Sequence, residues 1–196
     1  MLGLGTSINK SSSSESAFIA GRSSSFTGLL DESYGGSASA AYSVRRLSSS
    51  YSGKALQIRR VSDNVEVDVS FDNNNEISLD SAVTNVTEET TGSSTSIITG
   101  AVNLGEFVAN ASYTDADSLG STDSAKVQCW YDQSGSSNDA TQNTAGSQPT
   151  IVSSGALETE NGKPIIRNNG SNTMALPFND QAYKLYSVFN GEGQNI

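Results

Sequence analysis

The chain has 196 residues, of which 35% are hydrophobic and 16% are charged, and its formal net charge is -10. This length suits one domain with a core of its own and is short for two ordinary domains. The acidic balance, with a sequence pI ≈ 4.3, repels phosphate backbones and therefore argues against nucleic-acid binding.

The chain contains no histidine and one cysteine, Cys129. Without an imidazole, it cannot build a histidine-activated nucleophile, a Cys-His pair or a histidine-ligated zinc site on its own. Carboxylate chemistry remains the simple catalytic route. The polar run at residues 72–76 does not match an EF-hand calcium loop, and we interpret it as a turn between strands. Neither a metal nor a cofactor is expected.

Residues 1–28 form a serine-rich segment with two small apolar groups. Alone, such a segment buries too little surface to offset the entropy lost on ordering. One interpretation is a disordered tail, and the other is a docking arm that orders against a neighbouring subunit. We expect the arm. Its candidate docking residues are Leu2, Leu4, Ile8, Phe18 and Ile19.

The N-terminus also lacks the features of a secretory signal. No charged region precedes its short apolar patch, and glycines interrupt that patch. No apolar run approaches the length of a bilayer-spanning helix. We therefore expect a protein that is made in the cytoplasm, without membrane insertion.

Period-two alternation begins after residue 41 and predicts three strands. The clearest pattern is at residues 65–71, where apolar residues alternate with acidic and polar ones. Two earlier strands are expected at 42–47 and 55–59, joined by a turn at 51–53. Four of the eleven basic residues lie here and are expected to pair with acidic residues on neighbouring strands. They are Arg45, Arg46, Arg59 and Arg60.

Residues 80–124 are dense in Thr, Ser, Asn and Ala and show no clear period. Apolar groups at 97–98 and at Leu104, Phe107 and Val108 predict a short strand and one helical turn.

The strand pattern returns at residues 125–131 and leads into Asp132-Gln133-Ser134-Gly135. Asp followed by Ser-Gly predicts an Asx turn, in which the carboxylate accepts backbone N–H groups. Further short strands are expected at 150–152, 163–167, 173–176 and 185–189. About eight short strands without a helical period predict an all-β domain, a β-sandwich or jelly roll, over residues 29–196.

Six pieces of the sequence occur in a recognisable order: SVRRLSSSYSG, RRVSDN, WYDQSG, DATQ, QPTIV and NGKP. Together they cover about residues 29–170 and resemble the N-terminal half of a concanavalin A-like (LamG-type) jelly-roll domain of phage and prophage virion structural proteins. The opening MLGLGTS resembles the start of virion proteins that carry this module. The chain is more distantly similar to the catalytic domain of arabinofuranosidase B. In the phage relatives, the stretch at 80–124 is shorter, so the resemblance implies a surface insertion there, which is where a binding specificity would normally lie.

Two departures from the enzyme relatives argue against glycoside cleavage. Their catalytic carboxylates lie downstream of the matched region, and their adjacent cysteine pair is missing here. Glu158, Glu160 and Asp180 remain candidates for an acid and a base until distances are known. No catalytic residue is therefore assigned, and we expect no enzyme. The shortened C-terminal half would leave sheet edges open, which implies an incomplete sandwich that is completed by assembly into a homo-oligomer.

The resemblance implies a bacteriophage virion structural protein, a capsid decoration (cement) protein or a tail fibre component. Its arm would dock on the capsid, portal or tail and its jelly roll would be displayed. The alternative is a carbohydrate-binding module that attaches to host surface glycans, and a glycoside hydrolase ranks last. The candidate sugar-stacking residues are Tyr51, Tyr113, Trp130 and Tyr131.

Structural roles are expected for a second set of residues from the matched pieces. Trp130, the only tryptophan, ends an apolar strand and is favoured as a core anchor over a ligand contact. The remaining members are expected to pair strands or form the turn. They are Arg45, Arg46, Asp132 and Gly135.

Overall fold

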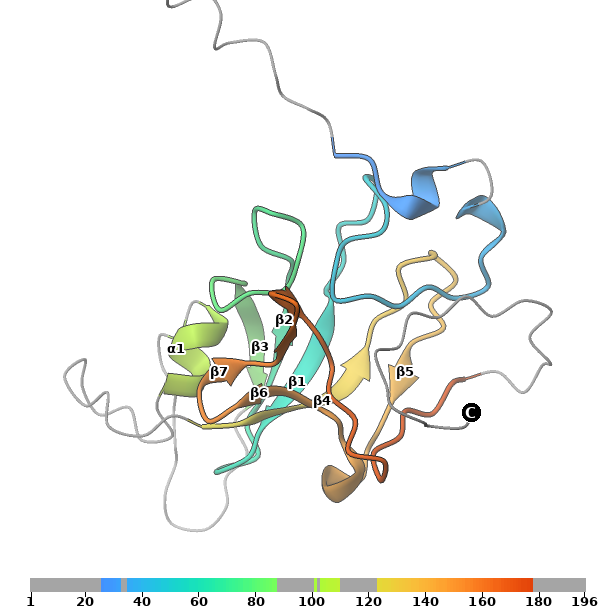
Figure 1. Cartoon of the computed structure of the whole chain (residues 1–196). Coiled ribbons are helices and arrows are strands. Elements are labelled where there is room, and N and C mark those ends of the chain that lie inside the picture. The colour runs from blue at the N-terminus through green and yellow to red at the C-terminus, as the bar shows by residue number, and fades with distance from the viewer. Residues whose placement is uncertain (1–25, 33–34, 88–100, 102, 110–122, 178–196) are drawn as a thin grey trace, which may run out of the picture.

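The computed structural model describes residues 26–32, 35–87, 101, 103–109 and 123–177. Figure 1 shows a curled antiparallel sheet with one short helix beside it, so the domain is all-β, as the sequence predicted. The sheet contains β1 Leu56–Arg60, β2 Glu66–Val69, β3 Val83–Thr87, β4 Ala125–Trp130, β5 Ala140–Thr141, β6 Thr150–Ser153 and β7 Ala156–Leu157. The strands β8 Thr159–Glu160 and β9 Lys163–Pro164 pair as a separate hairpin.

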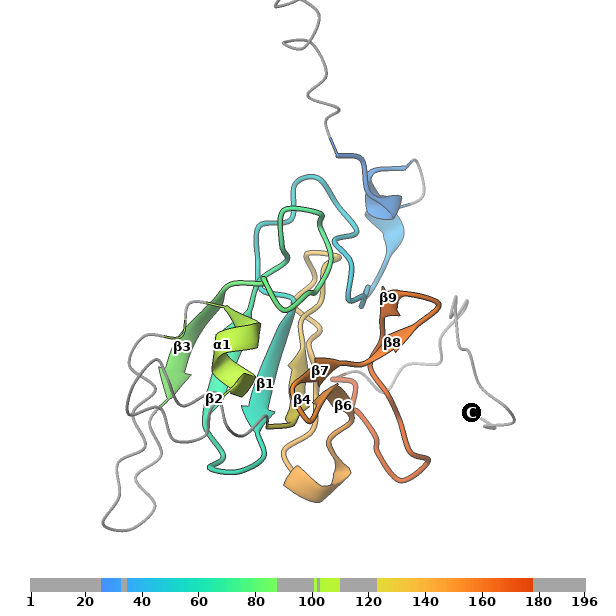
Figure 2. The same ribbon diagram turned by 60° about the vertical axis from the view of Figure 1, so that its left-hand side comes forward.

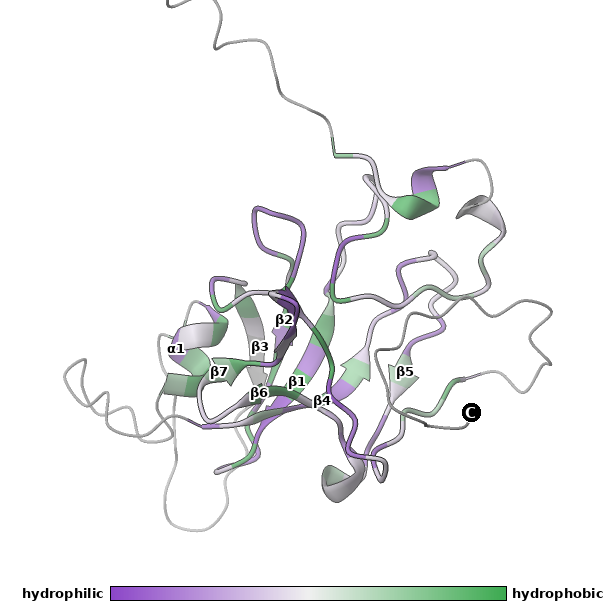
Figure 3. Ribbon diagram, in the orientation of Figure 1, coloured by the Kyte–Doolittle hydropathy of each residue, from purple (hydrophilic) through white to green (hydrophobic). Residues whose placement is uncertain are grey.

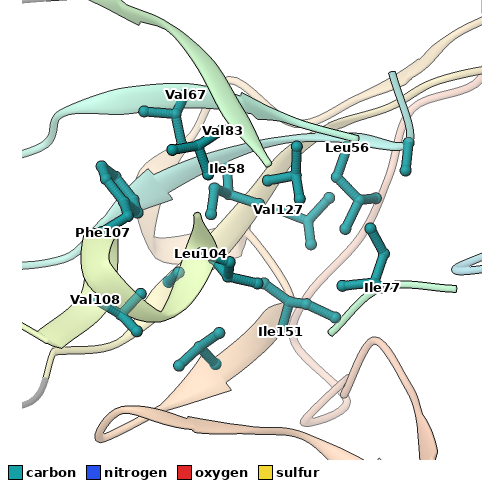
Figure 4. Close-up of a cluster of buried hydrophobic side chains, with 14 of the residues drawn as sticks. Leu56, Ile58, Val67, Ile77, Val83, Leu104, Phe107, Val108, Val127 and Ile151 are labelled. Carbon is teal, nitrogen blue, oxygen red and sulfur yellow. The ribbon is translucent and has the colours of Figure 1, made fainter. Parts of the chain in front are cut away.

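The strand order across the sheet is β3-β2-β1-β4-β6-β7. Outside this order, β5 pairs with the C-terminal end of β4, whereas β6 pairs with its N-terminal end. In the register of β1 with its neighbours, Ile58 is opposite both Val67 of β2 and Val127 of β4. Residues directly opposite one another share a face of the sheet. The apolar positions of three strands therefore meet on one side, where they form the core (Figure 4).

The helix α1 spans Leu104–Ala109 and covers this apolar face. Its residues Leu104, Phe107 and Val108 are at most 1% exposed and have the spacing of one helical face. Figures 2 and 4 show α1 against the strands. Within the expected surface insertion at 80–124, β3 and α1 thus belong to the sheet and core. The apolar pair at 97–98 lies outside the described residues.

A β-bulge in β4 places the tryptophan on the core side. The pairing of β1 with β4 shifts between Gln57 and Ile58, so that Leu56 is opposite Trp130 whereas Ile58 is opposite Val127. The extra residue shifts the in-and-out alternation of β4 by one position. Trp130 therefore lies on the same face of the sheet as Leu56. Trp130 is half-buried and packs against the core cluster.

The strand expected at residues 42–47 is not present. This segment has one isolated bridge, between Arg45 and Glu76, and otherwise follows an irregular path. The physical reason is that side chains of a distant turn, rather than a neighbouring strand, bond many of its backbone groups. The strands expected at 163–167 and 173–176 are shorter in the structure than in the prediction. The first is reduced to β9 and a single bridge at Arg167, and the second to a single bridge at Ala175. The strand expected at 185–189 lies outside the described residues.

The polar run at residues 72–76 is the turn that the sequence predicted. The Asp72 carboxylate accepts the N–H groups of Asn74 at 2.8 Å and Glu76 at 3.1 Å. Asn75 has a φ of 62°, a left-handed conformation that Asn adopts more readily than most residues. Figure 3 shows this loop as hydrophilic, in contrast to the green positions of the strands and α1. In the part of the chain that the structure covers, no helix is long and apolar enough to cross a bilayer.

Candidate functional site

The WYDQSG piece lies at the end of β4, beside an irregular N-terminal segment. We call residues 39–47 the strap and residues 131–139 the β4 turn. In Figure 1 the blue-to-cyan strap runs next to the yellow-to-orange turn. The two are separated by more than 80 residues of sequence, yet a dense set of hydrogen bonds joins them.

Gln133 is the centre of this contact and is 3% exposed. Its side-chain oxygen accepts the N–H of Leu47 at 2.7 Å, and its Nε2 donates to the carbonyls of Ser43 at 3.0 Å and Arg45 at 3.1 Å. Its backbone N–H donates to the carbonyl of Ala41 at 2.8 Å. Gln133 therefore provides hydrogen-bond partners for the backbone N–H and carbonyl groups of the strap, as a neighbouring strand would.

Asp132, which is 5% exposed, forms the expected Asx turn and also reaches the strap. Its Oδ1 accepts the N–H groups of Ala41 and Ser134, both at 2.8 Å. Its Oδ2 accepts the Ser134 hydroxyl at 2.7 Å and the Asn138 N–H at 3.1 Å. Burial opposes ionisation of this carboxyl, but the hydrogen bonds from Ser134, Ala41 and Asn138 outweigh it and lower the pKa of Asp132. Gly135 follows with a φ of 88°, which favours glycine.

Tyr42 and Asn138 close the far end of the contact. The Tyr42 hydroxyl donates to the Asn138 carbonyl, and the Asn138 Nδ2 donates to the Ser39 carbonyl at 2.7 Å. Burial, with the Asp132 and Asp139 carboxylates nearby, raises the pKa of Tyr42 to about 12. The Tyr42 ring lies 5.8 Å from the Trp130 ring. Trp130 thus contacts the strap on one side and the core on the other.

The other aromatic candidates for sugar stacking also have internal partners. The Tyr51 hydroxyl donates to the Lys54 carbonyl at 2.7 Å, and its ring packs edge-on against Phe71. The Tyr131 hydroxyl donates to Asp68 Oδ1 at 2.8 Å. Burial raises the pKa of Tyr51 to about 12 and also raises the pKa of Tyr131. These rings, like Trp130, are half-buried. Tyr113 lies outside the described residues.

Arg60 is completely buried, and the acidic partner described for it lies in a turn rather than on the neighbouring strand that the sequence suggested. It forms an ion pair with Asp63 in the turn that follows β1, and its Nη1 donates to the Phe107 carbonyl at 2.6 Å. Its guanidinium carbon lies 4.7 Å above the centre of the Phe107 ring. Arg60 therefore ties β1 to α1.

Of the other three arginines in that set, Arg46 and Arg59 bond neutral oxygens in their described contacts. Arg59 donates to Gln148 Oε1 at 2.8 Å and to Asn64 Oδ1 at 2.7 Å. Arg46 donates to the carbonyls of Ser48 at 2.9 Å and Ser49 at 2.7 Å. Arg45 has an exposed side chain and contributes its backbone to the bridge already described. The expected acidic partners are thus replaced by carbonyl and amide groups in the described contacts of Arg46 and Arg59.

A second carboxylate, Asp31, fixes the start of the described chain to the residues after the strap. It accepts the Gly28 N–H at 2.7 Å, the Ser48 hydroxyl at 2.8 Å and the Ser49 N–H at 2.8 Å. These hydrogen bonds, led by that from Gly28, lower the pKa of Asp31 to about 2. The Leu30 N–H also donates to the Leu47 carbonyl at 2.7 Å. Sequence reasoning missed Asp31, although an Asp three residues after Gly28 is a typical capping position.

The proposed docking residues Leu2, Leu4, Ile8, Phe18 and Ile19 all lie outside the described residues, as does Asp180. Glu158 and Glu160 are described, and both contact the same guanidinium. Arg167 is 2.6 Å from the Glu158 carboxylate and 3.9 Å from that of Glu160. This arrangement is an ion-pair cluster at the β8–β9 hairpin. Among the described residues, no group of three or more metal-ligating side chains could hold a metal ion.

No protein-family model, curated protein or solved structure matches this chain. The interpretation of the strap and the β4 turn therefore depends on their own contacts. The polar side chains of Gln133 and Asp132 are used to hold backbone groups in place, which is what a structural clamp requires.

Proposed function

We propose that this chain is a structural protein of a bacteriophage virion, either a capsid decoration (cement) protein or a tail fibre component. The observation that carries the proposal is the contact between two of the matched pieces, SVRRL in the strap and WYDQSG in the β4 turn. The amide of Gln133 and the carboxylate of Asp132 bond the strap backbone. The residues that carry the resemblance would thus have a structural role, in which they hold the backbone of the domain in place.

A scaffold role explains why these polar groups are poor candidates for catalysis. A catalytic acid, base or nucleophile needs an atom that can reach a substrate or exchange a proton. The two carboxylate oxygens of Asp132 accept four hydrogen bonds from within the chain. The side chain of Gln133 makes three more. A display protein needs no reactive group here, so the geometry favours it over a glycoside hydrolase.

The finer fold that we propose is a concanavalin A-like jelly roll that neighbouring subunits complete. Within the described residues, the curled sheet is accompanied only by the two-stranded β8–β9 hairpin. A jelly roll needs two packed sheets. A homo-oligomer would supply the missing strands and protect the open edges of the sheet.

The N-terminal arm would attach the domain to the capsid, portal or tail. Its apolar residues Leu2, Leu4, Ile8, Phe18 and Ile19 would enter grooves on a partner protein. Burial of apolar surface provides about 25 cal/mol per Å², which would offset the entropy lost when the arm orders. Among the described residues of the arm, Phe26 contacts the domain, and its ring centre lies 4.8 Å from the guanidinium carbon of Arg46.

The test is incorporation into particles. Virions would be purified from a lysate in which the chain is expressed, and the copies per particle would be measured by quantitative mass spectrometry. We expect incorporation of the wild-type chain and its loss when residues 1–25 are deleted. The deletion ends before Phe26 and Gly28 because both contact residues next to the strap or within it.

The matched control changes only the five apolar arm residues to serine and keeps the length of the arm. This variant is expected to be lost from particles as well. Absence of the wild-type chain from purified virions would overturn the proposed function. Normal incorporation of both variants would place the attachment surface on the sheet domain instead of the arm.

A further inference from the structure

We propose that residues 26–50 exchange between copies of this chain, so that the strap of one copy docks on the β4 turn of a second copy. This inference rests on the proposed function, and deepens it by naming the surface through which copies associate. Three features carry it: a terminal unit that holds itself together, a docking surface that binds main-chain atoms, and a short exposed connection between them.

The terminal unit is linked internally by its own side chains. Asp31 bonds Gly28, Ser48 and Ser49, all within residues 26–50. The guanidinium of Arg46 donates to the carbonyls of Ser48 and Ser49, and lies over the ring of Phe26. These contacts would stay intact if the unit left its own domain, so exchange does not require the unit to unfold.

The docking surface binds the strap mainly through its backbone. Asp132, Gln133 and Asn138 bond backbone groups at five strap positions between Ser39 and Leu47. On the other side of the strap, the Ile77 N–H donates to the Val44 carbonyl at 2.8 Å. Each contact has the same geometry whether the strap comes from the same copy or another. Exchange therefore costs no docking energy.

The connection between the unit and β1 is the segment 51–54. Ser52 and Gly53 are exposed, and the Tyr51 hydroxyl closes the segment on the Lys54 carbonyl at 2.7 Å. A Cβ on Gly53 would lie 2.5 Å from that hydroxyl, so a larger residue there would displace the Tyr51 ring. This segment is the hinge. Its conformation is what distinguishes docking within one copy from docking between two copies.

Local concentration then decides between the two forms. When a strap can dock within its own copy, exchange has to compete with an intramolecular contact. Copies held side by side on a particle have a high effective concentration for one another. A hinge that is too short to fold back removes the intramolecular form, while a longer hinge favours it. Assembly on a particle would therefore favour exchanged straps.

The first experiment changes the hinge of the full chain. Deletion of Ser52 and Gly53 is expected to double the mass in sedimentation at all concentrations, whereas insertion of Gly-Ser-Gly-Ser between them is expected to give a monomer. Adding Gln133→Ala and Asp132→Ala to the deletion should remove the dimer. A deletion variant that stays a folded monomer, with its strap still protected from trypsin, would overturn the inference.

The second experiment does not depend on a hinge variant folding. A photo-crosslinking phenylalanine derivative replaces Tyr42, whose hydroxyl bonds the Asn138 carbonyl. Isotopically heavy and light copies are unfolded together, refolded at high concentration and irradiated. Crosslinks between a heavy strap and a light β4 turn are expected. Crosslinks found only within one isotope would overturn exchange. Because particles are not involved, this result is distinguishable from failure of the proposed virion function.

Discussion

The side-chain oxygen of Gln133 accepts a hydrogen bond from the Leu47 N–H at 2.7 Å, across 86 residues of sequence. The nitrogen of the same amide donates to two further carbonyls of the strap. One buried side chain therefore fills both a donor and an acceptor role toward an irregular backbone. Since buried backbone groups need partners, the strap can stay in place without belonging to a regular strand.

Gln133→Glu tests this double role because the new side chain has nearly the same shape. It keeps an acceptor for the Leu47 N–H but replaces the Nε2 donor with an oxygen that faces the carbonyls of Ser43 and Arg45. Leaving such buried groups unpaired costs about 1–3 kcal/mol each. We expect the free energy of unfolding in urea to fall and trypsin to cut faster after Arg45.

The matched control is Ser39→Ala, which changes a strap side chain but keeps the carbonyl that Asn138 binds. It is expected to change the unfolding free energy by less than about 0.5 kcal/mol, as most surface substitutions do. If Gln133→Glu were equally mild, the amide would not be what holds the strap.

Asp132→Asn is expected to flatten the dependence of stability on pH in the acid range. The pKa of Asp132 is lower in the folded chain than its ordinary value. Its ionised form therefore stabilises the fold above the unfolded pKa, and this stabilisation is lost as the pH falls through the folded pKa. Asn does not titrate. Below about pH 4, the wild-type unfolding free energy should fall more steeply than that of the variant.

A graded version of the same experiment uses Ser134→Ala. This change removes the hydroxyl that donates to Asp132 at 2.7 Å but leaves the carboxyl in place. The folded pKa of Asp132 should then rise part of the way toward its ordinary value, and the loss of stability should begin at a higher pH. Chemical unfolding at a series of pH values measures both variants. Parallel pH profiles for all three proteins would contradict the assignment.

The regular parts of the sheet were predictable because their signals are local. Alternation of apolar and polar residues identifies β2 at 66–69, and Asp132 with Ser134 identifies the Asx turn. The strap at 39–47 has similar alternation but a different structure, because its main partners are the side chains of a turn far along the chain. Nothing within the segment signals that Gln133 will replace a neighbouring strand.

The two described partners of Arg60 were not predicted from the sequence, for a related reason. Its counter-ion is Asp63, only three residues away in the RRVSD piece, so a local signal existed. Its second partner, the Phe107 carbonyl, comes from α1 and requires knowledge of the tertiary fold. Likewise, the resemblance suggested that residues 80–124 are a surface insertion. Spacing of Leu104, Phe107 and Val108 on one helical face was the better guide to their burial.

Arg60→Ala should be among the most destabilising substitutions in the domain. It leaves the Asp63 carboxylate without its cation and the Phe107 carbonyl without its donor. Removing one partner of a buried ion pair costs about 3–5 kcal/mol. Arg60→Lys keeps the charge but loses the planar fork, so an intermediate loss is expected. Arg45→Ala is the matched control, since that side chain is exposed. Thermal and urea unfolding would compare all three variants, and equal stability of the Arg60 and Arg45 variants would contradict the prediction.

Phe107→Ala distinguishes a helix that completes the core from one that belongs to a surface insertion. The Phe107 side chain has no exposed surface and packs with the apolar face of β1 and β2 (Figure 4). A buried Phe replaced by Ala costs about 3–5 kcal/mol, because apolar contacts are lost and a cavity remains. The neighbouring exposed Glu106, changed to Gln, is expected to cost far less. Urea unfolding of the two variants measures the difference. In the sequence, α1 lies between β3 and β4, and it covers the core. If Phe107→Ala lowered the free energy of unfolding by less than about 1 kcal/mol, the sheet would keep its packing without the helix.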